Sequence, residues 1–177
     1  MWREWSLFIF RISSRVSKMD KRIKTSLKKF RIRPMTAADV NEIVLMEIEV
    51  FTDPWPRAAF TEELDREGRG VLIAESDGII TGYAAYMVGF GEAHLTNIAV
   101  APPYRGKNIA KLLLNCIFGI AREAECENIF LDVRPSNKPA IALYRKFGFF
   151  ELYVRPNYYH SPAENALVMV KNLREED

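Results

Sequence analysis

The chain has 177 residues, of which 49% are hydrophobic and 27% charged, and this is enough for one domain with a sizeable core and a short extension. Its two cysteines, Cys116 and Cys126, show no paired spacing and only two histidines are present, so the sequence supports neither a disulfide framework nor a zinc site. No run is long and apolar enough to cross a bilayer, and a reducing cytoplasm is the simplest setting.

The net charge of +2 is unevenly distributed. Residues 1–30 carry nine Lys or Arg and only two Asp or Glu, so the rest of the chain is mildly acidic. Apolar residues recur in this extension every three or four positions, the period of one helix face. A basic amphipathic helix can bind anionic lipid or RNA. The alternative, which we favour, is that these residues are a non-essential leader and that translation starts later, at Met19 or Met35. The segment lacks the uninterrupted apolar core and the small-residue cleavage site of a signal peptide.

The predicted domain spans residues 31–173, followed by a short acidic tail at 174–177. In its first half the pattern predicts an edge strand at 32–35, a helix from Thr36 to Val50, a second helix at 57–66, and strands at 70–75 and 79–90. On the first helix, apolar contacts are expected from Ile43, Met46, Ile48 and Val50. Asp77-Gly78, between the two strands, suits a tight hairpin turn.

The loop from Phe51 to Pro56 contains two prolines and two aromatic residues. Proline fixes the backbone at low entropic cost, so this loop can hold Phe51 and Trp55 in place as the wall of a binding site. A hydrophobic staple between the two helices explains the same residues. The local sequence leaves both interpretations open.

The second half of the domain alternates strands and helices. The predicted elements are a strand at 94–100, a helix at 107–125, a strand at 128–134, a helix at 138–147 begun by a Ser136-Asn137 cap and ended by Gly148, and strands at 149–154 and 166–171. In the strand at 128–134, Ile129, Leu131 and Val133 are expected on one face. Strands separated by helices, with a central hairpin, indicate an α/β sheet of mixed direction.

A short basic turn joins the strand at 94–100 to the next helix. Pro102 and Pro103 end the strand, since proline cannot donate to a sheet ladder. The first N–H groups of a helix have no intrahelical partner, so the segment from Arg105 to Lys111 suits a pyrophosphate. An ordinary strand–turn–helix with a solvated basic cap explains the turn equally well.

Six segments occur in order along the chain: Asn97–Val100, Tyr104–Ala110, Leu131–Asn137, Ala140–Tyr144, Gly148-Phe149 and Arg155–Tyr159. Together they resemble the GNAT acetyltransferase superfamily, and more narrowly its branch of ribosomal-protein-alanine N-acetyltransferases. The resemblance covers about residues 31–173. It implies the α/β GNAT fold, in which helices flank a mixed central sheet and two parallel strands, here 94–100 and 128–134, splay apart.

The resemblance implies that acetyl-CoA is the co-substrate and that no metal takes part. Backbone groups of Ile98, Ala99 and Val100 would bind the pantetheine and the thioester oxygen. The pyrophosphate would lie on the turn, on Arg105, Gly106, Lys107, Asn108, Ile109, Ala110 and Lys111. Asn137 would bind the cofactor arm, or is simply a helix cap. The family usually has Gly where Asn108 stands; Asn tolerates positive φ, although its side chain could crowd the pyrophosphate.

By analogy with the family, Tyr144 would protonate the leaving thiolate and a carboxylate would act as base. The family has Glu where this chain has Asp132, and the shorter side chain would act through a water. In the alternative, Asp132 only pairs with a cation and Glu92 is the base. Neither cysteine falls on a catalytic position of the family, so we expect direct transfer in a ternary complex.

The acceptor would lie in a slot formed by Arg155, Tyr158 and Tyr159 together with the aromatic residues Phe51 and Trp55. Tyrosine pairs also serve as interface or core residues, so the pair alone does not define a slot. An α-amino group has a pKa near 8, and about a tenth of it is neutral at pH 7, whereas a lysine near 10.4 is almost fully charged. An N-terminus therefore suits a weak or indirect base.

The predicted function is transfer of acetyl from acetyl-CoA to the α-amino group of a protein, the N-terminal alanine of a small-subunit ribosomal protein above all. The enzyme is expected in the cytoplasm, without direct contact with nucleic acid. Three alternatives stay open: a lysine or small-amine acetyltransferase, a non-catalytic acyl-CoA-binding or ribosome-associated module, and an enzyme held at a membrane by residues 1–30.

Overall fold

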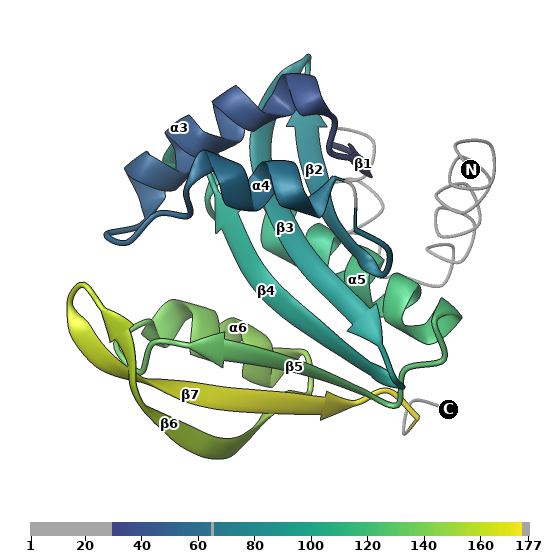
Figure 1. Ribbon diagram of the computed structural model, residues 1–177, viewed down its shortest axis with the longest axis vertical. Helices are drawn as coiled ribbons and strands as arrows, with labels where there is room; N and C mark the ends of the chain where they lie inside the picture. Colours follow the sequence, from purple (N-terminus) through teal and green to yellow (C-terminus); the bar gives the residue numbers. More distant parts are fainter. Residues whose placement is uncertain (1–29, 65, 175–177) are drawn as a thin grey trace.

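The computed structural model describes residues 30–64 and 66–174, which form one mixed sheet of seven strands with four α-helices (Figure 1). The elements are β1 (Arg31–Pro34), η2 (Ala37–Asp39), α3 (Val40–Val50), α4 (Arg57–Glu63), β2 (Arg69–Ser76), β3 (Ile79–Gly89), β4 (Glu92–Val100), η3 (Pro102–Tyr104), α5 (Ile109–Glu123), β5 (Asn128–Val133), α6 (Lys138–Lys146), β6 (Phe150–His160) and β7 (Ala163–Asn172). The strand order is β1-β2-β3-β4-β5-β7-β6, and neighbours are antiparallel except β4 and β5, which are parallel. The predicted GNAT-type mixed sheet is confirmed.

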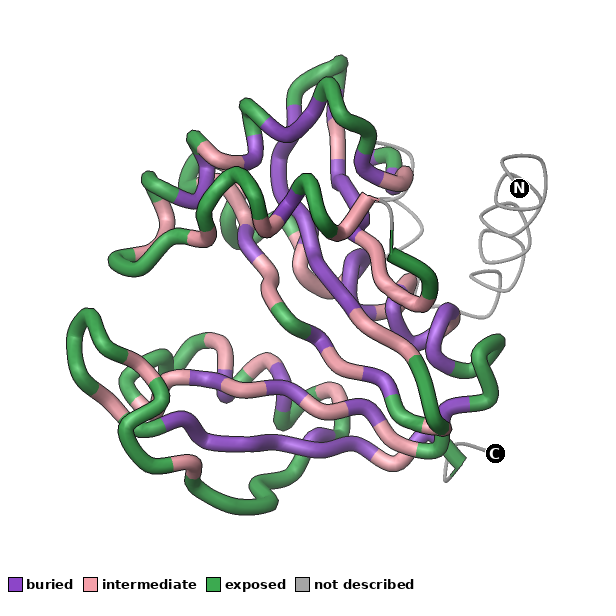
Figure 2. Tube along the Cα trace, in the orientation of Figure 1, coloured by how far each residue is buried: buried purple, intermediate pink, exposed green. Residues whose placement is uncertain are grey.

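The two faces of the sheet carry separate hydrophobic clusters. Figure 2 shows buried residues along the strands and along the helices. α3 and α4 cover one face of the β2–β4 half, where the side chains of Ile43, Phe60 and Tyr83 are fully buried. α5 and α6 belong to the cluster on the other face, together with alternate residues of the strands. On β5 the alternation is the predicted one, with Ile129, Leu131 and Val133 buried. Side chains that point the other way from β5 therefore face the α3 side.

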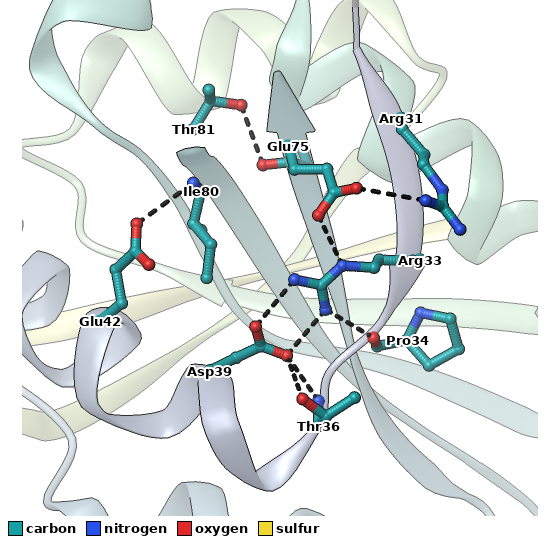
Figure 3. Close-up of polar contacts among 10 residues, drawn as sticks. Arg31, Arg33, Pro34, Thr36, Asp39, Glu42, Glu75, Ile80 and Thr81 are labelled. Carbon is teal, nitrogen blue, oxygen red and sulfur yellow. Dashed lines mark hydrogen bonds and ion pairs between the residues drawn. The ribbon is translucent and has the colours of Figure 1, made fainter. Parts of the chain in front are cut away.

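An ion-pair network fixes the start of α3 to the edge of the sheet (Figure 3). The Arg33 guanidinium on β1 donates to both Asp39 oxygens at 2.7 and 2.8 Å and to Glu75 of β2 at 2.6 Å. Thr36 donates to Asp39 through its N–H and its hydroxyl, which with the arginine holds the pKa of Asp39 at about 2. Glu42 accepts from a backbone N–H of β3 at 3.2 Å. The helix axis is thereby set relative to the sheet.

The parallel strands pair over only part of their length. Their register runs from Glu92 opposite Asn128 to Leu95 opposite Leu131 and then stops. β4 is irregular just after Leu95, and a bulge of this kind bends a strand away from its neighbour. In Figure 1 the two strands lie close at their amino ends and diverge toward their carboxyl ends. We call residues 96–100 of β4 and 132–133 of β5 the open end of the strand pair; the predicted splay is confirmed.

Most predicted elements match the observed ones. The hairpin between β2 and β3 turns at Asp77 and Gly78, both with positive φ (53° and 79°), as a tight Asp-Gly turn requires. α6 is capped by Asn137, whose side chain accepts from the Ala140 N–H, and Gly148 follows it with φ 83°. The start and the end of α6 are therefore determined by residues next to them in the sequence.

Four details of the predicted elements were wrong. Ile48 is 61% exposed, because the buried face of α3 runs through Val40, Ile43 and Met46 and leaves position 48 on the outside. α4 ends at Glu63 instead of 66. α5 begins at Ile109, because Asn108 before it has left-handed backbone angles. The last two strands are longer than predicted, since they pair with each other as far as His160 and Ala163.

Residues 1–29 and 175–177 lie outside the described part of the chain, and with them nearly all of the predicted basic helix and the acidic tail. Phe30 is described and is 3% exposed, packed in the cluster that contains α5, so the domain core begins there. Among the described residues, no helix is both long and apolar enough to cross a membrane. The same residues hold no group of three or more His, Cys, Asp or Glu side chains that could bind a metal.

Candidate active site

The backbone of β4 at the open end has a strand neighbour on one side only. Ile98, Ala99 and Val100 pair with β3 and lie beyond the last residue pair with β5. Gly82 on β3 permits a close approach here, because a Cβ at this position would lie 2.7 Å from the Ala99 carbonyl oxygen and 3.2 Å from Ile109. The absence of that Cβ lets the start of α5 pack against β3. The Ala101 N–H donates to the Thr81 carbonyl of β3, and successive residues of a strand point their backbone groups to opposite edges. Of the three predicted backbone positions, Ile98 and Val100 therefore face the open end, whereas Ala99 faces β3.

The turn before α5 leaves the first N–H groups of this helix without a side-chain cap. Gly106 and Asn108 both have positive φ, 76° and 64°. Asn108 occupies the cap position, yet its side chain makes no capping hydrogen bond. The N–H groups of residues 109–111 precede the first intrahelical bond, which Leu112 makes to the Asn108 carbonyl. As predicted, Asn adopts the conformation for which the family usually uses Gly.

The basic side chains of this turn are only loosely held. Arg105 is exposed, and its Nε donates to the Val100 carbonyl at 3.3 Å. The Lys107 ammonium lies 4.7 Å from the centre of the Tyr104 ring. Two cations therefore stand beside the uncapped helix end, an arrangement suited to a phosphate group.

α6 contributes two of the predicted residues. The Asn137 side-chain oxygen accepts from the Ala140 N–H at 3.2 Å, so the simple helix-cap interpretation of this residue holds, and its amide group adds two donors. Tyr144 is 5% exposed and packs against Phe149, with ring centres 5.8 Å apart. Burial, and secondarily Tyr159, raises the pKa of Tyr144, which keeps its hydroxyl protonated. A neutral tyrosine can donate a proton.

Asp132 lies at the beginning of the open end on the face of β5 opposite the apolar one. One of its oxygens is 3.6 Å from the Arg155 guanidinium. The other oxygen, Oδ1, is buried and has no hydrogen-bond partner among the described residues. Burial raises the pKa of Asp132, while Arg155 and His94 act in the opposite direction. A carboxylate oxygen without a partner is available to accept a proton.

Glu92, the alternative base, is placed elsewhere. It is the first residue of β4, pairs with Asn128, and lies at the closed end of the strand pair, within 3.7 Å of His94. Its side chain is half exposed. The structure therefore does not bring Glu92 to the open end, because three paired residues of β4 separate it from that end.

The loop 51–56 fits both interpretations of its aromatic residues. Phe51 and Trp55 are half-buried and pack against the α3–α4 cluster, and the Trp55 ring lies 5.6 Å from that of Phe60. Their remaining surface is exposed. The Thr52 hydroxyl donates to the Ser161 carbonyl at 2.7 Å, which joins this loop to the tip of the β6–β7 hairpin. Two segments far apart in sequence thus meet beside the open end (Figure 1).

The predicted slot residues of β6 lie together. The rings of Tyr158 and Tyr159 are edge to face, 5.0 Å apart, and the Arg155 guanidinium lies 5.0 Å from the Tyr158 ring centre. Burial, with smaller contributions from Tyr158 and Asp132, raises the pKa of Tyr159 to about 12. Tyr159 interacts electrostatically with both of the predicted proton-transfer groups, Tyr144 and Asp132.

Two further charged residues, not predicted from the sequence, hold the β6–β7 hairpin. The Arg134 guanidinium stacks 4.0 Å from the Tyr159 ring centre and donates to the carbonyls of Ser161 and Pro162 at 3.0 and 2.8 Å. Glu164 accepts from the Ser136 N–H and hydroxyl at 2.7 and 2.8 Å. These contacts are long range, so no local pattern could have indicated them.

Glu47 is a third residue that the sequence analysis missed. Its carboxylate accepts from the Trp55 N–H at 2.7 Å and from the Asn97 side chain at 3.0 Å. A signal for it existed, because Glu47 occupies the helical position between Ile43 and Val50 on the inner stripe of α3, where an apolar residue is expected. A charged residue inside an apolar stripe indicates a buried polar contact.

The arrangement can perform acyl transfer without a covalent enzyme intermediate. At the open end a carboxylate oxygen without a partner lies where β4 offers backbone groups, and the protonated Tyr144 interacts with Tyr159, as Asp132 does. Neither cysteine takes part in this group, and burial raises the pKa of the Cys116 thiol to about 12, which suppresses the nucleophilic thiolate.

Comparisons with known proteins agree with this arrangement. The model of the Acetyltransferase (GNAT) family matches residues 40–149. A Haemophilus influenzae [ribosomal protein bS18]-alanine N-acetyltransferase is 33% identical over 78% of this chain and 95% of its own length, and the Mycobacterium tuberculosis N-alpha-acetyltransferase RimI is 34% identical over 78% and 89%. The crystal structure of the Escherichia coli ribosomal-protein-S18-alanine N-acetyltransferase superimposes with a TM-score of 0.75 at 28% identity, covering 81% of this chain and 94% of that one.

Proposed function

Because this chain belongs to the GNAT acetyltransferase family, we propose that it transfers the acetyl group of acetyl-CoA to the α-amino group of a protein, namely the N-terminal alanine of a small-subunit ribosomal protein. The relatives named for this reaction support the choice of acceptor. The observation that carries the proposal is the open end of β4 and β5, where the unpartnered Asp132 oxygen lies with free backbone groups of β4. The protonated Tyr144 interacts with Tyr159, as Asp132 does.

Acetyl-CoA is the co-substrate in this proposal and supplies the acetyl group as a thioester. Backbone groups of Ile98 and Val100, which point away from β3, bind its pantetheine and stabilise the oxyanion. Ala99 does not take the role predicted for it, because its backbone groups face β3. The N–H groups of Ile109, Ala110 and Lys111 bind the pyrophosphate, assisted by Arg105, Gly106, Lys107 and Asn108 of the turn. Asn137 uses its amide donors toward the cofactor arm while its oxygen caps α6. The fit rests on backbone groups that the fold leaves available.

The acceptor enters from the α3 side in this proposal. Phe51 and Trp55 form one wall, and Arg155, Tyr158 and Tyr159 form the other. The bond from Thr52 to Ser161 joins the two walls outside the open end, so the slot is closed on that side. An internal lysine must bring main chain on both sides of itself, whereas an N-terminus brings it on one side only. The closed slot therefore favours a chain end.

Proton transfer assigns complementary roles to two side chains. The acceptor nitrogen attacks the thioester carbonyl carbon and the C–S bond breaks. The proton lost by the nitrogen passes to Asp132 Oδ1, directly or through one water, and Tyr144 donates its proton to the leaving sulfur. Burial raises the pKa of Asp132 and so strengthens it as a base. An α-amino group with a pKa near 8 needs little help to lose its proton.

The proposal is tested by release of free CoA when the purified full-length protein meets acetyl-CoA and an Ala-initiated ribosomal peptide. The matched control is the same peptide with a blocked N-terminus and its lysine retained. We expect turnover on the free N-terminus only. Turnover on both peptides would identify a lysine or general amine acetyltransferase. Binding of acetyl-CoA without turnover on either would identify a non-catalytic acyl-CoA-binding module.

A cytoplasmic location follows from this proposal, because ribosomal proteins are made and assembled there. Contact of residues 1–30 with a membrane is a separate hypothesis. It predicts that the full chain sediments with anionic vesicles and that a chain lacking residues 1–30 does not.

A further inference from the structure

Glu47 is a carboxylate with no exposed surface. It lies in the last turn of α3, and its two oxygens have one donor each: the Trp55 N–H at 2.7 Å and the Asn97 side-chain amide at 3.0 Å. Within residues 30–64 and 66–174, no Lys, Arg or His forms an ion pair with it. Its neighbours on the inner stripe of α3 are apolar.

Burying a carboxylate of this kind lowers the free energy of unfolding. A buried carboxylate without a cation loses its hydration, and two neutral donors replace only part of it. The consequence is visible in the protonation equilibrium, since burial raises the pKa of Glu47 to about 7 against the effect of both donors. A leucine or methionine at this position would fill the same helical stripe at lower cost. The hydrogen bonds to Trp55 and Asn97 therefore explain why a carboxylate occupies this position.

The two donors come from the two parts of the proposed active site. Trp55 belongs to the loop 51–56, which forms one wall of the acceptor slot. Asn97 lies on β4 directly before Ile98, the first of the backbone positions proposed for the thioester. Thr52 holds the other end of the same loop to Ser161. Glu47 is thus the direct side-chain connection between the acceptor loop and the strand that carries the donor groups.

We propose that Glu47 is a positioning residue, whose buried carboxylate fixes the acceptor loop 51–56 relative to β4 and so aligns the acceptor amine with the thioester. This inference rests on the proposed function. Loss of the contact frees the Trp55 end of the loop, while β4 keeps its pairing with β3, where Asn97 lies opposite Ala85. Binding of the acceptor suffers, and binding of acetyl-CoA does not. A displacement of about 1 Å in such a wall costs substantial rate.

The test uses a charge swap with a matched control. Glu47→Ala removes both bonds. Asn97→Asp places a second carboxylate against the first. The double variant Glu47→Gln/Asn97→Asp restores both bonds, because the Gln oxygen accepts from Trp55 N–H and the Gln amide donates to the new aspartate. Glu49→Gln is the control, since Glu49 is an exposed residue of the same helix.

We expect Glu47→Ala and Asn97→Asp to raise the KM for the Ala-initiated peptide about 10-fold, with the KM for acetyl-CoA within about twofold of the wild-type value. The double variant should return the peptide KM to within about threefold of wild type, and Glu49→Gln should leave both unchanged. An equal loss in both KM values and in kcat, or a double variant no better than Asn97→Asp alone, would overturn the proposal. If Glu47→Ala does not fold, the comparison of Asn97→Asp with the double variant decides.

A second measurement is independent of catalysis. The Trp55 amide is hydrogen-bonded only while Glu47 accepts from it, so hydrogen exchange at Trp55 should be faster in Glu47→Ala and of wild-type rate in the double variant. If the wild-type protein acetylates no peptide, the proposed function fails, and the exchange result still shows whether Glu47 holds the loop. Unchanged exchange at Trp55 in Glu47→Ala would refute the contact itself.

Discussion

The proposed acceptor side and the proposed donor side of the open end are built from different groups. On the acceptor side, the side chains of Glu47, Thr52 and Arg134 all have specific hydrogen-bond partners that tie loops together. On the proposed donor side, β4 has no strand neighbour along the open end, and the first turn of α5 has no side-chain cap from Asn108. Side chains shape one side, and backbone conformation shapes the other.

This difference predicts how each side responds to substitution. A backbone N–H is present whatever the side chain, unless the residue is proline, so the donor side should tolerate side-chain changes that preserve φ and ψ. The acceptor side depends on single side chains. The contrast should be strongest at Asp132 and Glu47 and weakest at Asn108.

Asp132→Asn should lower kcat/KM for the peptide about 100-fold, because it removes the unpartnered oxygen as a proton acceptor while keeping the shape of the side chain. Asp132→Glu, which restores the residue usual in the family, should retain most of the activity. The measurement is CoA release at saturating acetyl-CoA. A loss of less than about threefold in Asp132→Asn would contradict a role as base.

Glu47 should make the protein less stable as the pH rises from 5 to 8. Its pKa in the folded protein is raised from 4.5 to about 7, so the folded state holds a proton that the unfolded state releases. The favourable contribution is complete below about pH 4.5 and is lost as the pH passes 7. The full difference corresponds to about 3 kcal/mol.

The measurement for Glu47 is urea unfolding of the wild type and Glu47→Gln at several pH values. Between pH 5 and 8, the free energy of unfolding of the variant should rise relative to that of the wild type by about 2.5 kcal/mol. Asp39, with a pKa of about 2, titrates below this window and does not interfere. A difference that does not depend on pH would show that Glu47 is ionised throughout.

Tyr144→Phe should lower kcat about 10-fold and leave both KM values unchanged. The hydroxyl is protonated because burial raises its pKa, and its loss removes the proton donor for the departing sulfur. The effect is smaller than that of Asp132, because a thiol with a pKa near 8.5 leaves with little assistance. Tyr144 is thus the one residue of the proposed donor side at which we expect the loss of a side chain to lower activity. An unchanged kcat would mean that water protonates the sulfur.

The smallest effects are expected at Asn108. Asn108→Gly keeps the left-handed backbone and removes the side chain beside the first N–H groups of α5, so the KM for acetyl-CoA should fall by about twofold. Asn108→Ala should cost about 1 kcal/mol of stability, since alanine disfavours φ 64°. Thermal unfolding and donor KM together measure this. A large loss of donor affinity in Asn108→Gly would show that the Asn side chain itself binds acetyl-CoA.

Local patterns in the sequence were sufficient for much of this site. The alternation of β5 placed Asp132 opposite Leu131, and Pro102 with the apolar run after Asn108 located the start of α5 to within two residues. The Asn137 cap needed only its own helix. Such features depend on neighbours in the chain, which is why periodicity and capping rules find them.

The alternatives that the sequence left open concern contacts between distant segments. Asp132 and Glu92 are both acidic residues near predicted strands, and only the register of β4 with β5 puts one at the open end and the other at the closed end. The bond from Thr52 to Ser161 spans 109 positions. No local rule contains such information, because it arises from how the sheet and its loops pack.

The sequence by itself determined the elements, the order in which they occur and the resemblance to one family, since each of these depends on residues within a turn or a strand of one another. Tertiary structure alone decided which carboxylate lacks a partner, and that Glu47 is buried between the acceptor loop and β4. The physical reason is that desolvation depends on everything packed around a group. Burial raises the pKa of Asp132 and of Glu47 through neighbours that lie far away in the chain.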